Sequence, residues 1–252
     1  MVIGNANYDS IGNLKNPVND ARGMYYALKD VDFDSVLYVE NGSKKKMNRA
    51  IGAFNRVLKR EHLKGKETVA LFYYSGHGAQ YGDENYLLPV TLNDQVSNNL
   101  DTIFASDTIK VNDVMDGMEK AKSTMQIVIL DACRDNPLQT KGNKIGSKNV
   151  GKGLAWIDNS NRVKRSVPKG TFIAYATSPH NVALDEGRDN SPYTKHLLTN
   201  IRTKGLSIEN IFKKVRKSLI SETNGRQVPR EDCSLDDDFY FAGFKRRRIR
   251  SG

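Results

Sequence analysis

The sequence lacks the features of a secreted or membrane-spanning protein. Its 252 residues include only two cysteines, Cys133 and Cys233, which is too few for a disulfide framework. No apolar run approaches the roughly 20 residues that cross a bilayer, and no charged-then-apolar leader resembles a signal peptide. We therefore expect a cytoplasmic protein in which Cys133 is a free thiol.

Negative charge is also scarce, but the excess of positive charge is local. The net charge is +10, to which residues 138–170 contribute +7 and the tail from Lys245 to Arg250 contributes +5. The rest of the chain is therefore close to neutral. This distribution is unlike the basic stripe of a nucleic-acid-binding domain. We expect neither a specific nucleic-acid partner nor a membrane partner.

Short apolar runs alternate with amphipathic segments along the chain. The runs predict strands over residues 1–5, 35–40, 68–74, 126–131 and 171–176, and a last edge strand over 239–241. The amphipathic segments predict helices over residues 16–30, 44–60, 111–122, 192–203 and 207–223, with Asn16 and Asn112 as caps of the first and third. This order favours an α/β fold with a mainly parallel sheet covered on both faces. Residues 137–170 are polar and without period, which predicts a mobile loop inserted within one domain.

Two short strings carry reactive side chains directly after predicted strands. They are Ser75-Gly76-His77-Gly78 and Asp131-Ala132-Cys133-Arg134, and we expect each to form a turn at the end of its strand. An imidazole beside a thiol can accept its proton and later protonate a leaving amine. The backbone N–H groups of Gly78 and Cys133 could stabilise the oxyanion of an attacked amide. The pattern therefore indicates acyl transfer to Cys133 followed by hydrolysis.

Each half of this pair also has an ordinary structural interpretation. A lone cysteine at a strand end is often a small buried hydrophobe, and a lone histidine is often only a hydrogen-bonded polar group. The other candidates are weaker still: His62 lies at a charged helix end, His180 follows a proline, and His196 is in mid-helix. Cys233 lies among acidic residues, which predicts a raised thiol pKa.

In these motifs the sequence resembles the caspase-like cysteine peptidases of clan CD, and is most similar to bacterial relatives of the metacaspases and paracaspases, the orthocaspases. The matching segments, in family order, are Val2-Ile3-Gly4-Asn5, Leu14-Lys15-Asn16-Pro17-Val18-Asn19-Asp20-Ala21, Tyr74-Ser75-Gly76-His77-Gly78, Tyr86-Leu87-Leu88-Pro89, Asp131-Ala132-Cys133-Arg134, Ala176-Thr177-Ser178-Pro179 and Arg226-Gln227-Val228-Pro229. The resemblance implies a three-layer caspase-like fold with a mostly parallel six-stranded sheet flanked by helices. It also implies a dyad of His77 as general base and acid and Cys133 as nucleophile, with Gly78 as an oxyanion donor and no required cofactor.

The resemblance further suggests which bond is cut. Metacaspases and paracaspases carry acids at the positions of Asp20 and Asp131. A third pocket position, found by counting from Thr177, is the acid Asp185. Ser178 lies in the same region of the substrate site. Carboxylates around one pocket bind a guanidinium or ammonium group and repel an aspartate. We therefore expect cleavage after Arg or Lys. Asp20 alone could instead favour a helix N-terminus.

The family also sets expectations for organisation. We assign residues 1–244 to one peptidase domain and 245–252 to a basic tail. Residues 138–170 lie where caspases are cut into subunits, and a protease selecting Arg or Lys could process itself there at Lys152, Lys164 or Arg165; the alternative is an uncut surface loop. Calcium activates many metacaspases, but the sequence has no EF-hand pattern, and we assign no metal site. We expect a monomer that is part of a larger multidomain chain.

Two alternatives to this function stay open. One is a catalytically silent caspase-like module used in signalling or assembly, and the other is a clan CD peptidase with another specificity.

Overall fold

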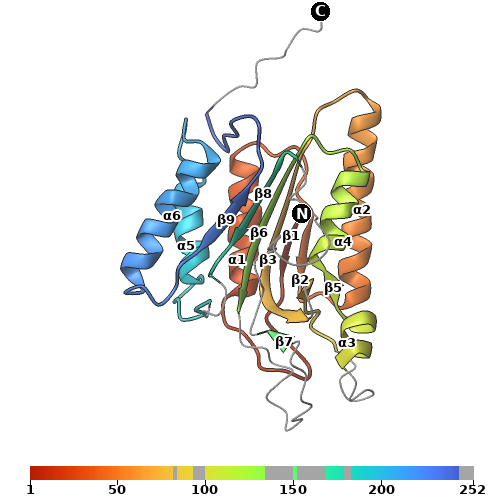
Figure 1. The fold of residues 1–252 in the computed structure, drawn as a ribbon, viewed down its shortest axis with the longest axis vertical. Helices are drawn as coiled ribbons and strands as arrows, with labels where there is room; N and C mark the ends of the chain where they lie inside the picture. Colours follow the sequence, from red (N-terminus) through yellow and green to blue (C-terminus); the bar gives the residue numbers. More distant parts are fainter. Residues whose placement is uncertain (82–83, 93–99, 134–149, 152–168, 179–182, 244–252) are drawn as a thin grey trace, which may run out of the picture.

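A six-stranded sheet forms the centre of the molecule. The computed structural model describes residues 1–81, 84–92, 100–133, 150–151, 169–178 and 183–243, with only the backbone at 100, 133, 150 and 151. The strands lie in the order β2 (Tyr38–Glu40), β1 (Val2–Gly4), β3 (Val69–Tyr81), β6 (Met125–Cys133), β8 (Thr171–Tyr175) and β9 (Arg230–Cys233). All neighbours are parallel except β9, which is antiparallel to β8. The predicted mostly parallel sheet is confirmed (Figure 1).

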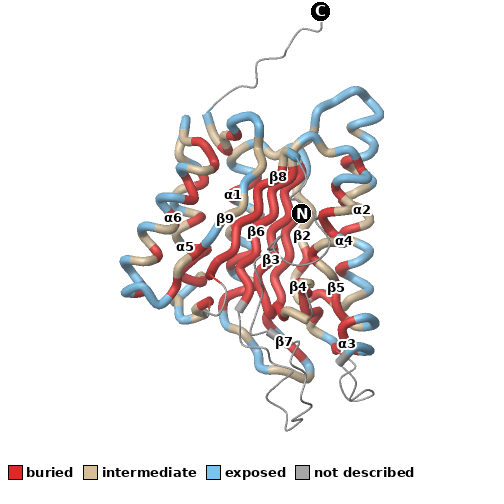
Figure 2. The backbone as a smooth tube through the Cα atoms, viewed as in Figure 1, coloured by how far each residue is buried: buried red, intermediate tan, exposed pale blue. Residues whose placement is uncertain are grey.

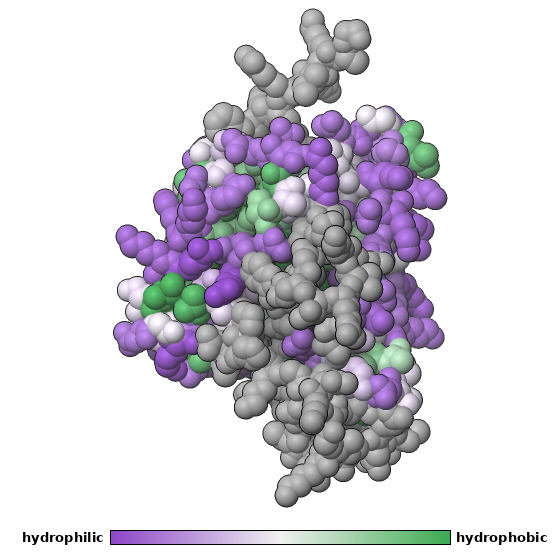
Figure 3. Space-filling view, viewed as in Figure 1, coloured by the Kyte–Doolittle hydropathy of each residue, from purple (hydrophilic) through white to green (hydrophobic). Residues whose placement is uncertain are grey.

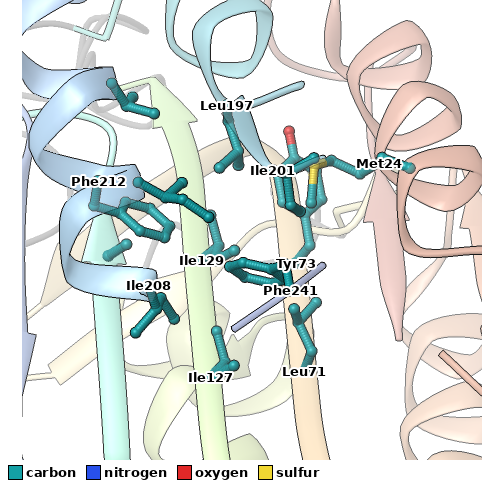
Figure 4. Close-up of a cluster of buried hydrophobic side chains, with 14 of the residues drawn as sticks. Met24, Leu71, Tyr73, Ile127, Ile129, Leu197, Ile201, Ile208, Phe212 and Phe241 are labelled. Atoms are coloured by element: carbon teal, nitrogen blue, oxygen red, sulfur yellow. The ribbon is translucent and has the colours of Figure 1, made fainter. Parts of the chain in front are cut away.

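Helices cover both faces of this sheet and complete three layers. One face carries α1 (Pro17–Asp30), α5 (Pro192–Asn200) and α6 (Ile208–Glu222), and the other carries α2 (Lys44–Leu63) and α4 (Val111–Lys120). Side chains along a strand alternate between the two faces. Thus Leu71 and Tyr73 of β3 pack toward α1 and α5, as Figure 4 shows, whereas Phe72 and Tyr74 pack toward α2 and α4. The central strands are accordingly buried on both sides (Figure 2).

Local signals account for where several helices begin. Ser43, Ser191 and Ser207 are N-caps whose hydroxyl oxygens accept hydrogen bonds from the first turns of α2, α5 and α6. The expected cap at Asn112 is wrong, because this residue lies inside α4 and donates to Glu84 instead, at 2.7 Å. Asn16 is the N-cap position of α1, but its side chain makes no cap hydrogen bond.

Four short elements were not predicted from the sequence. They are β4 (Glu84–Leu87), α3 (Leu100–Asp107), β5 (Ile109–Lys110) and β7 (Val150–Gly151). β4 folds back antiparallel on the last four residues of β3, β5 pairs with β4, and β7 pairs with Gln80–Tyr81. Part of the segment expected to be a loop without structure, 137–170, is therefore a strand, because the long β3 offers it a free edge. Most of that segment lies outside the described residues.

The predicted last strand is misplaced. The edge strand is Arg230–Cys233, and residues 239–241 make only an isolated bridge between Tyr240 and Ser207. Phe239 and Phe241 are buried in the same apolar layer as α5 and α6, so their side chains fill the core rather than extend the sheet. The charged sequence of β9 suits an edge that is half-exposed.

One face of the described surface is mostly polar. On the face drawn in Figure 3, hydrophilic side chains predominate and apolar ones form small patches. Within the described ranges, no helix has the length and apolar character needed to cross a membrane.

Candidate active site

His77 and Cys133 occupy aligned positions on adjacent parallel strands. The register of β3 and β6 pairs His77 with Cys133, the last residue of β6. Neighbouring strands are about 4.8 Å apart, so the two backbones are direct neighbours. The expected turns after Tyr74 and after Leu130 are both wrong, because Ser75–His77 of β3 pairs with Asp131–Cys133 of β6. Beyond His77, β3 continues to Tyr81, since β4 supplies a partner for this extension. The alignment nevertheless brings both predicted residues to one edge of the sheet.

The imidazole of His77 is held by a backbone carbonyl. Its Nε2 lies 2.7 Å from the oxygen of Gly12, in the segment that follows β1. A carbonyl can only accept a hydrogen bond, so this contact assigns the proton to Nε2 and leaves Nδ1 as the basic nitrogen. The side chain is buried. Gly12 as orienting group was missed from the sequence, because it lies 65 residues from the histidine in a segment with no regular structure.

Two tyrosines fix the backbone on which His77 is carried. The Tyr8 hydroxyl accepts a hydrogen bond from the His77 N–H at 2.7 Å, and its ring lies 4.6 Å from the imidazole, centroid to centroid. The Tyr74 hydroxyl donates to the His77 carbonyl at 2.7 Å. Gly76 leaves the space for them, since a Cβ there would lie 2.6 Å from the Tyr74 oxygen and 2.8 Å from that of Tyr8. The glycine before His77 is thus required by packing.

The position of Gly78 suits an oxyanion donor. Gly78 is aligned with Leu87 of β4, and the Leu88 N–H donates to the His77 carbonyl at 3.1 Å. This pattern makes Gly78 and Leu87 a non-hydrogen-bonded pair, whose N–H groups point away from each other. Because β4 lies on the β1 side of β3, where the Asn5 side chain donates to Leu88, the Gly78 N–H points toward the side of Cys133.

Asp20 and Asp131 form a buried acid pair. Asp20 lies in the first turn of α1 and Asp131 near the end of β6, and they are 0% and 5% exposed. Burial, and then the charge of Asp131, raise the pKa of Asp20 to about 8. Burial raises the pKa of Asp131 to about 6, with a further contribution from Asp185. Asp131 thus interacts electrostatically with both of the other predicted acids.

The acid pair is surrounded by hydrogen-bond donors. Asp20 accepts from the Ser75 hydroxyl at 3.1 Å, the Asn190 amide at 3.0 Å and the Ser191 N–H at 2.9 Å. Asp131 accepts from the hydroxyls of Ser191 and Thr194 at 2.5 and 2.7 Å. Sequence reasoning missed residues 190, 191 and 194. The helix predicted over 192–203 begins beside these residues, but nothing local indicated what its start would contact.

Asp185 and Ser178 have structural contacts of their own. The Asp185 carboxylate accepts from the N–H groups of Lys15 and Asn16, at 2.5 and 3.0 Å, at the start of α1. These two residues directly precede α1, so Asp185 joins its own segment to the start of that helix, while Asp20 lies in the first turn of the helix itself. The Ser178 hydroxyl donates to the Val228 carbonyl at 2.8 Å and accepts from Arg230 at 3.1 Å, so it joins the end of β8 to the segment before β9.

The remaining candidate residues lie away from this edge or outside the described part. Burial raises the pKa of the Cys233 thiol, and the neighbouring Glu209 carboxylate adds to the effect, which confirms the expected direction. Lys152, Lys164, Arg165 and His180 lie outside the described residues. Among the residues that are described, no three His, Cys, Asp or Glu side chains gather as a metal site would require.

A histidine and a cysteine thus occupy aligned positions on adjacent strands of a mostly parallel sheet that helices cover on both faces, which is an α/β architecture. The family described as Caspase domain matches residues 1–240. The chain therefore belongs to the caspase-domain family of cysteine peptidases.

Individual relatives are distant. The chain is 26% identical over 134 residues to the mucosa-associated lymphoid tissue lymphoma translocation protein 1 of Homo sapiens, a match covering 53% of this chain and 15% of that protein. It is 24% identical over 257 residues to caspase-12 of Canis lupus familiaris, covering 95% of this chain and 61% of that one. The chain thus spans less than two thirds of both. A solved structure of pro-sf-caspase-1 has the same fold, with a TM-score of 0.63 at 14% identity, covering 97% of this chain and 89% of the other.

Proposed function

We propose that this chain is a cysteine endopeptidase of the orthocaspase type, which cleaves protein substrates after Arg or Lys with Cys133 as nucleophile. The observation that carries the proposal is the pairing of His77 with Cys133 at the edge of the sheet where Asp20 and Asp131 are buried together. The family supplies the reaction class, and the acids supply the specificity.

The chemistry follows from the assigned proton on His77. Nδ1 takes the proton of the Cys133 thiol as its sulfur attacks the peptide carbonyl carbon, and the N–H groups of Gly78 and Cys133 stabilise the resulting oxyanion. The protonated imidazole gives its proton to the leaving amine, which departs and leaves a thioester. His77 then deprotonates a water molecule that attacks the thioester. Collapse of this second intermediate releases the carboxylate product and restores the thiol.

The acid pair favours a substrate with a positively charged side chain on the residue directly before the scissile bond. Both carboxylates are buried, so an incoming guanidinium or ammonium group has to open a path to them. Once there, its positive charge displaces the proton that burial keeps on Asp20 and makes an attractive contact with each carboxylate. A substrate aspartate at the same position would place a negative charge beside the ionised Asp131 and be rejected.

The test is a panel of fluorogenic peptides that differ only in the last residue, Arg, Lys or Asp, assayed with and without calcium. We expect Arg and Lys reporters to be cleaved and the Cys133→Ala variant to be inactive. Preferred turnover of the Asp reporter would overturn the specificity. No turnover, together with no covalent labelling of Cys133 by a thiol probe, would support the silent assembly module instead.

The same preparation tests self-processing. Cleavage at Lys152, Lys164 or Arg165 would give fragments of wild-type protein that are absent from Cys133→Ala. Intact mass spectrometry over time, with and without calcium, decides this, and sedimentation of both proteins tests the expected monomer.

A further inference from the structure

Ser191 joins the two buried acids through one residue. Its backbone N–H donates to Oδ1 of Asp20 at 2.9 Å, and its hydroxyl donates to Oδ2 of Asp131 at 2.5 Å. The same hydroxyl accepts from the Thr194 N–H at 3.0 Å, which makes Ser191 the N-cap of α5. The start of this helix therefore also fixes the separation of the carboxylates.

Thr194 adds a second donor from the first turn of the same helix. Its hydroxyl lies 2.7 Å from Oδ2 of Asp131 and 2.6 Å from the Tyr73 hydroxyl. A carboxylate accepts, and a threonine hydroxyl has one hydrogen, so Thr194 donates to Asp131 and Tyr73 donates to Thr194. The result is a chain of hydrogen bonds that runs from β3 through α5 to the end of β6.

This arrangement leaves one oxygen of Asp131 for a ligand. Both donors bind Oδ2, and no residue in the described ranges donates a hydrogen bond to Oδ1. All members of the array are buried, where a carboxylate without donors favours its neutral form. Two donors on one oxygen also fix the rotation of the carboxylate group.

We propose that the first turn of α5 is a positioning device for recognition of the basic side chain: Ser191 and Thr194, supported by Tyr73, hold Asp131 ionised with Oδ1 available to the guanidinium. This inference rests on the proposed function. Thr194 does not touch the reacting atoms; it acts on the substrate through Asp131.

The test compares Thr194→Val with Thr194→Ser, which keeps the donor, and with Thr199→Val, the same change on the exposed side of α5. For Thr194→Val, loss of a hydrogen bond to a charged group predicts a KM for the Arg reporter about tenfold higher, with a smaller change in kcat. The acid limb of kcat/KM moves to higher pH, because Asp131 loses a donor. Alkylation of Cys133 by iodoacetamide keeps its rate, and Thr194→Ser restores wild-type behaviour.

The outcomes separate this inference from the proposed function. A Thr194→Val profile that matches Thr199→Val in KM and pH dependence overturns the positioning role. Equal losses of turnover and of Cys133 alkylation, without a shift in pH, also overturn it, because they indicate general damage. A wild type that cleaves neither Arg nor Lys reporters overturns the proposed function. Melting temperatures measured at a series of pH values then still decide whether Thr194 controls the pKa of Asp131. Of the three variants, only Thr194→Val should shift the pH range over which stability falls.

Discussion

Replacing Asp20 by asparagine is expected to stabilise the protein while removing cleavage after Arg and Lys. The carboxylate is buried and its pKa is raised from 3.8 to about 8. The folded protein therefore holds this proton more tightly than the unfolded chain. Below pH 3.8 both states are protonated and the group has no effect, and as the pH rises toward 8 the unfolded state is favoured by ionisation. The loss of stability caused by Asp20 reaches its full size above pH 8.

The magnitude follows from the size of that window. A pH of 7 lies about three units above the pKa of 3.8 that Asp20 has in the unfolded chain. At 1.36 kcal/mol per unit, buried Asp20 therefore lowers the free energy of unfolding by at most about 4 kcal/mol. Asparagine has no charge and can keep the contacts: its oxygen accepts from Asn190 and Ser191, and its amide donates to a rotated Ser75 hydroxyl. We expect a gain of about 2 kcal/mol after imperfect replacement of these bonds, or roughly 4–8 °C in melting temperature for a domain of this size.

The assay is thermal unfolding at pH 5 and pH 8, with Asp34→Asn as the control, since Asp34 is an exposed acid on the connection after α1. Asp20→Asn should gain more at pH 8 than at pH 5, and the control should change little at either. The same variant should lose turnover of the Arg reporter. A loss of stability at pH 8, or an equal change at both pH values, would refute the reasoning.

Three further results are expected. The kcat/KM for the Arg reporter should fall as the pH drops from 8 through 6, because protonation of Asp20 and Asp131 removes the charge that attracts the substrate; a profile that is flat over this range contradicts the acid pair as the pocket. Tyr8→Phe should lower kcat/KM about tenfold, since the buried His77 N–H loses its acceptor, whereas the exposed Tyr26→Phe should leave it unchanged. Gly76→Ala should lower stability by about 1–3 kcal/mol in a urea titration, because the added Cβ would lie too close to both tyrosine oxygens; unaltered stability would show that the tyrosines move aside at little cost.

The sequence predicted the parts of the fold that depend on local periodicity. Continuous apolar runs predicted the central strands, which are buried on both faces, and amphipathic spacing predicted the five long helices, which bury one face. It failed where pairing with a distant segment decides the outcome. The Ser75–Gly78 string contains small residues typical of a turn, yet Ser75–His77 lies within β3 because it pairs with Asp131–Cys133, more than 50 residues away in the sequence. The edge strand 230–233 is charged, so its sequence carries no strand-like period.

The candidate site shows the same division. His77, Cys133, Asp20 and Asp131 were identified because their neighbours in sequence form recognisable motifs. The residues that hold them were not, since the bonds from Ser191 to Asp20 and from Gly12 to His77 join positions 171 and 65 residues apart. Such contacts depend on how α1, α5 and the sheet edge meet, which a single sequence does not specify.

The acid pair links stability to the proposed recognition of a basic side chain. Donors from Ser75, Asn190, Ser191 and Thr194 lower the pKa values of the two carboxylates, but burial outweighs them and leaves both values raised. At neutral pH the empty site therefore keeps a proton on Asp20. A guanidinium that binds both acids has to displace this proton, so binding of Arg or Lys should release about one proton near pH 7. A neutral substrate residue at the same position would leave the proton in place and gain no attraction from the acid pair. The burial that lowers the stability of the empty protein would therefore also increase its selectivity for a basic residue.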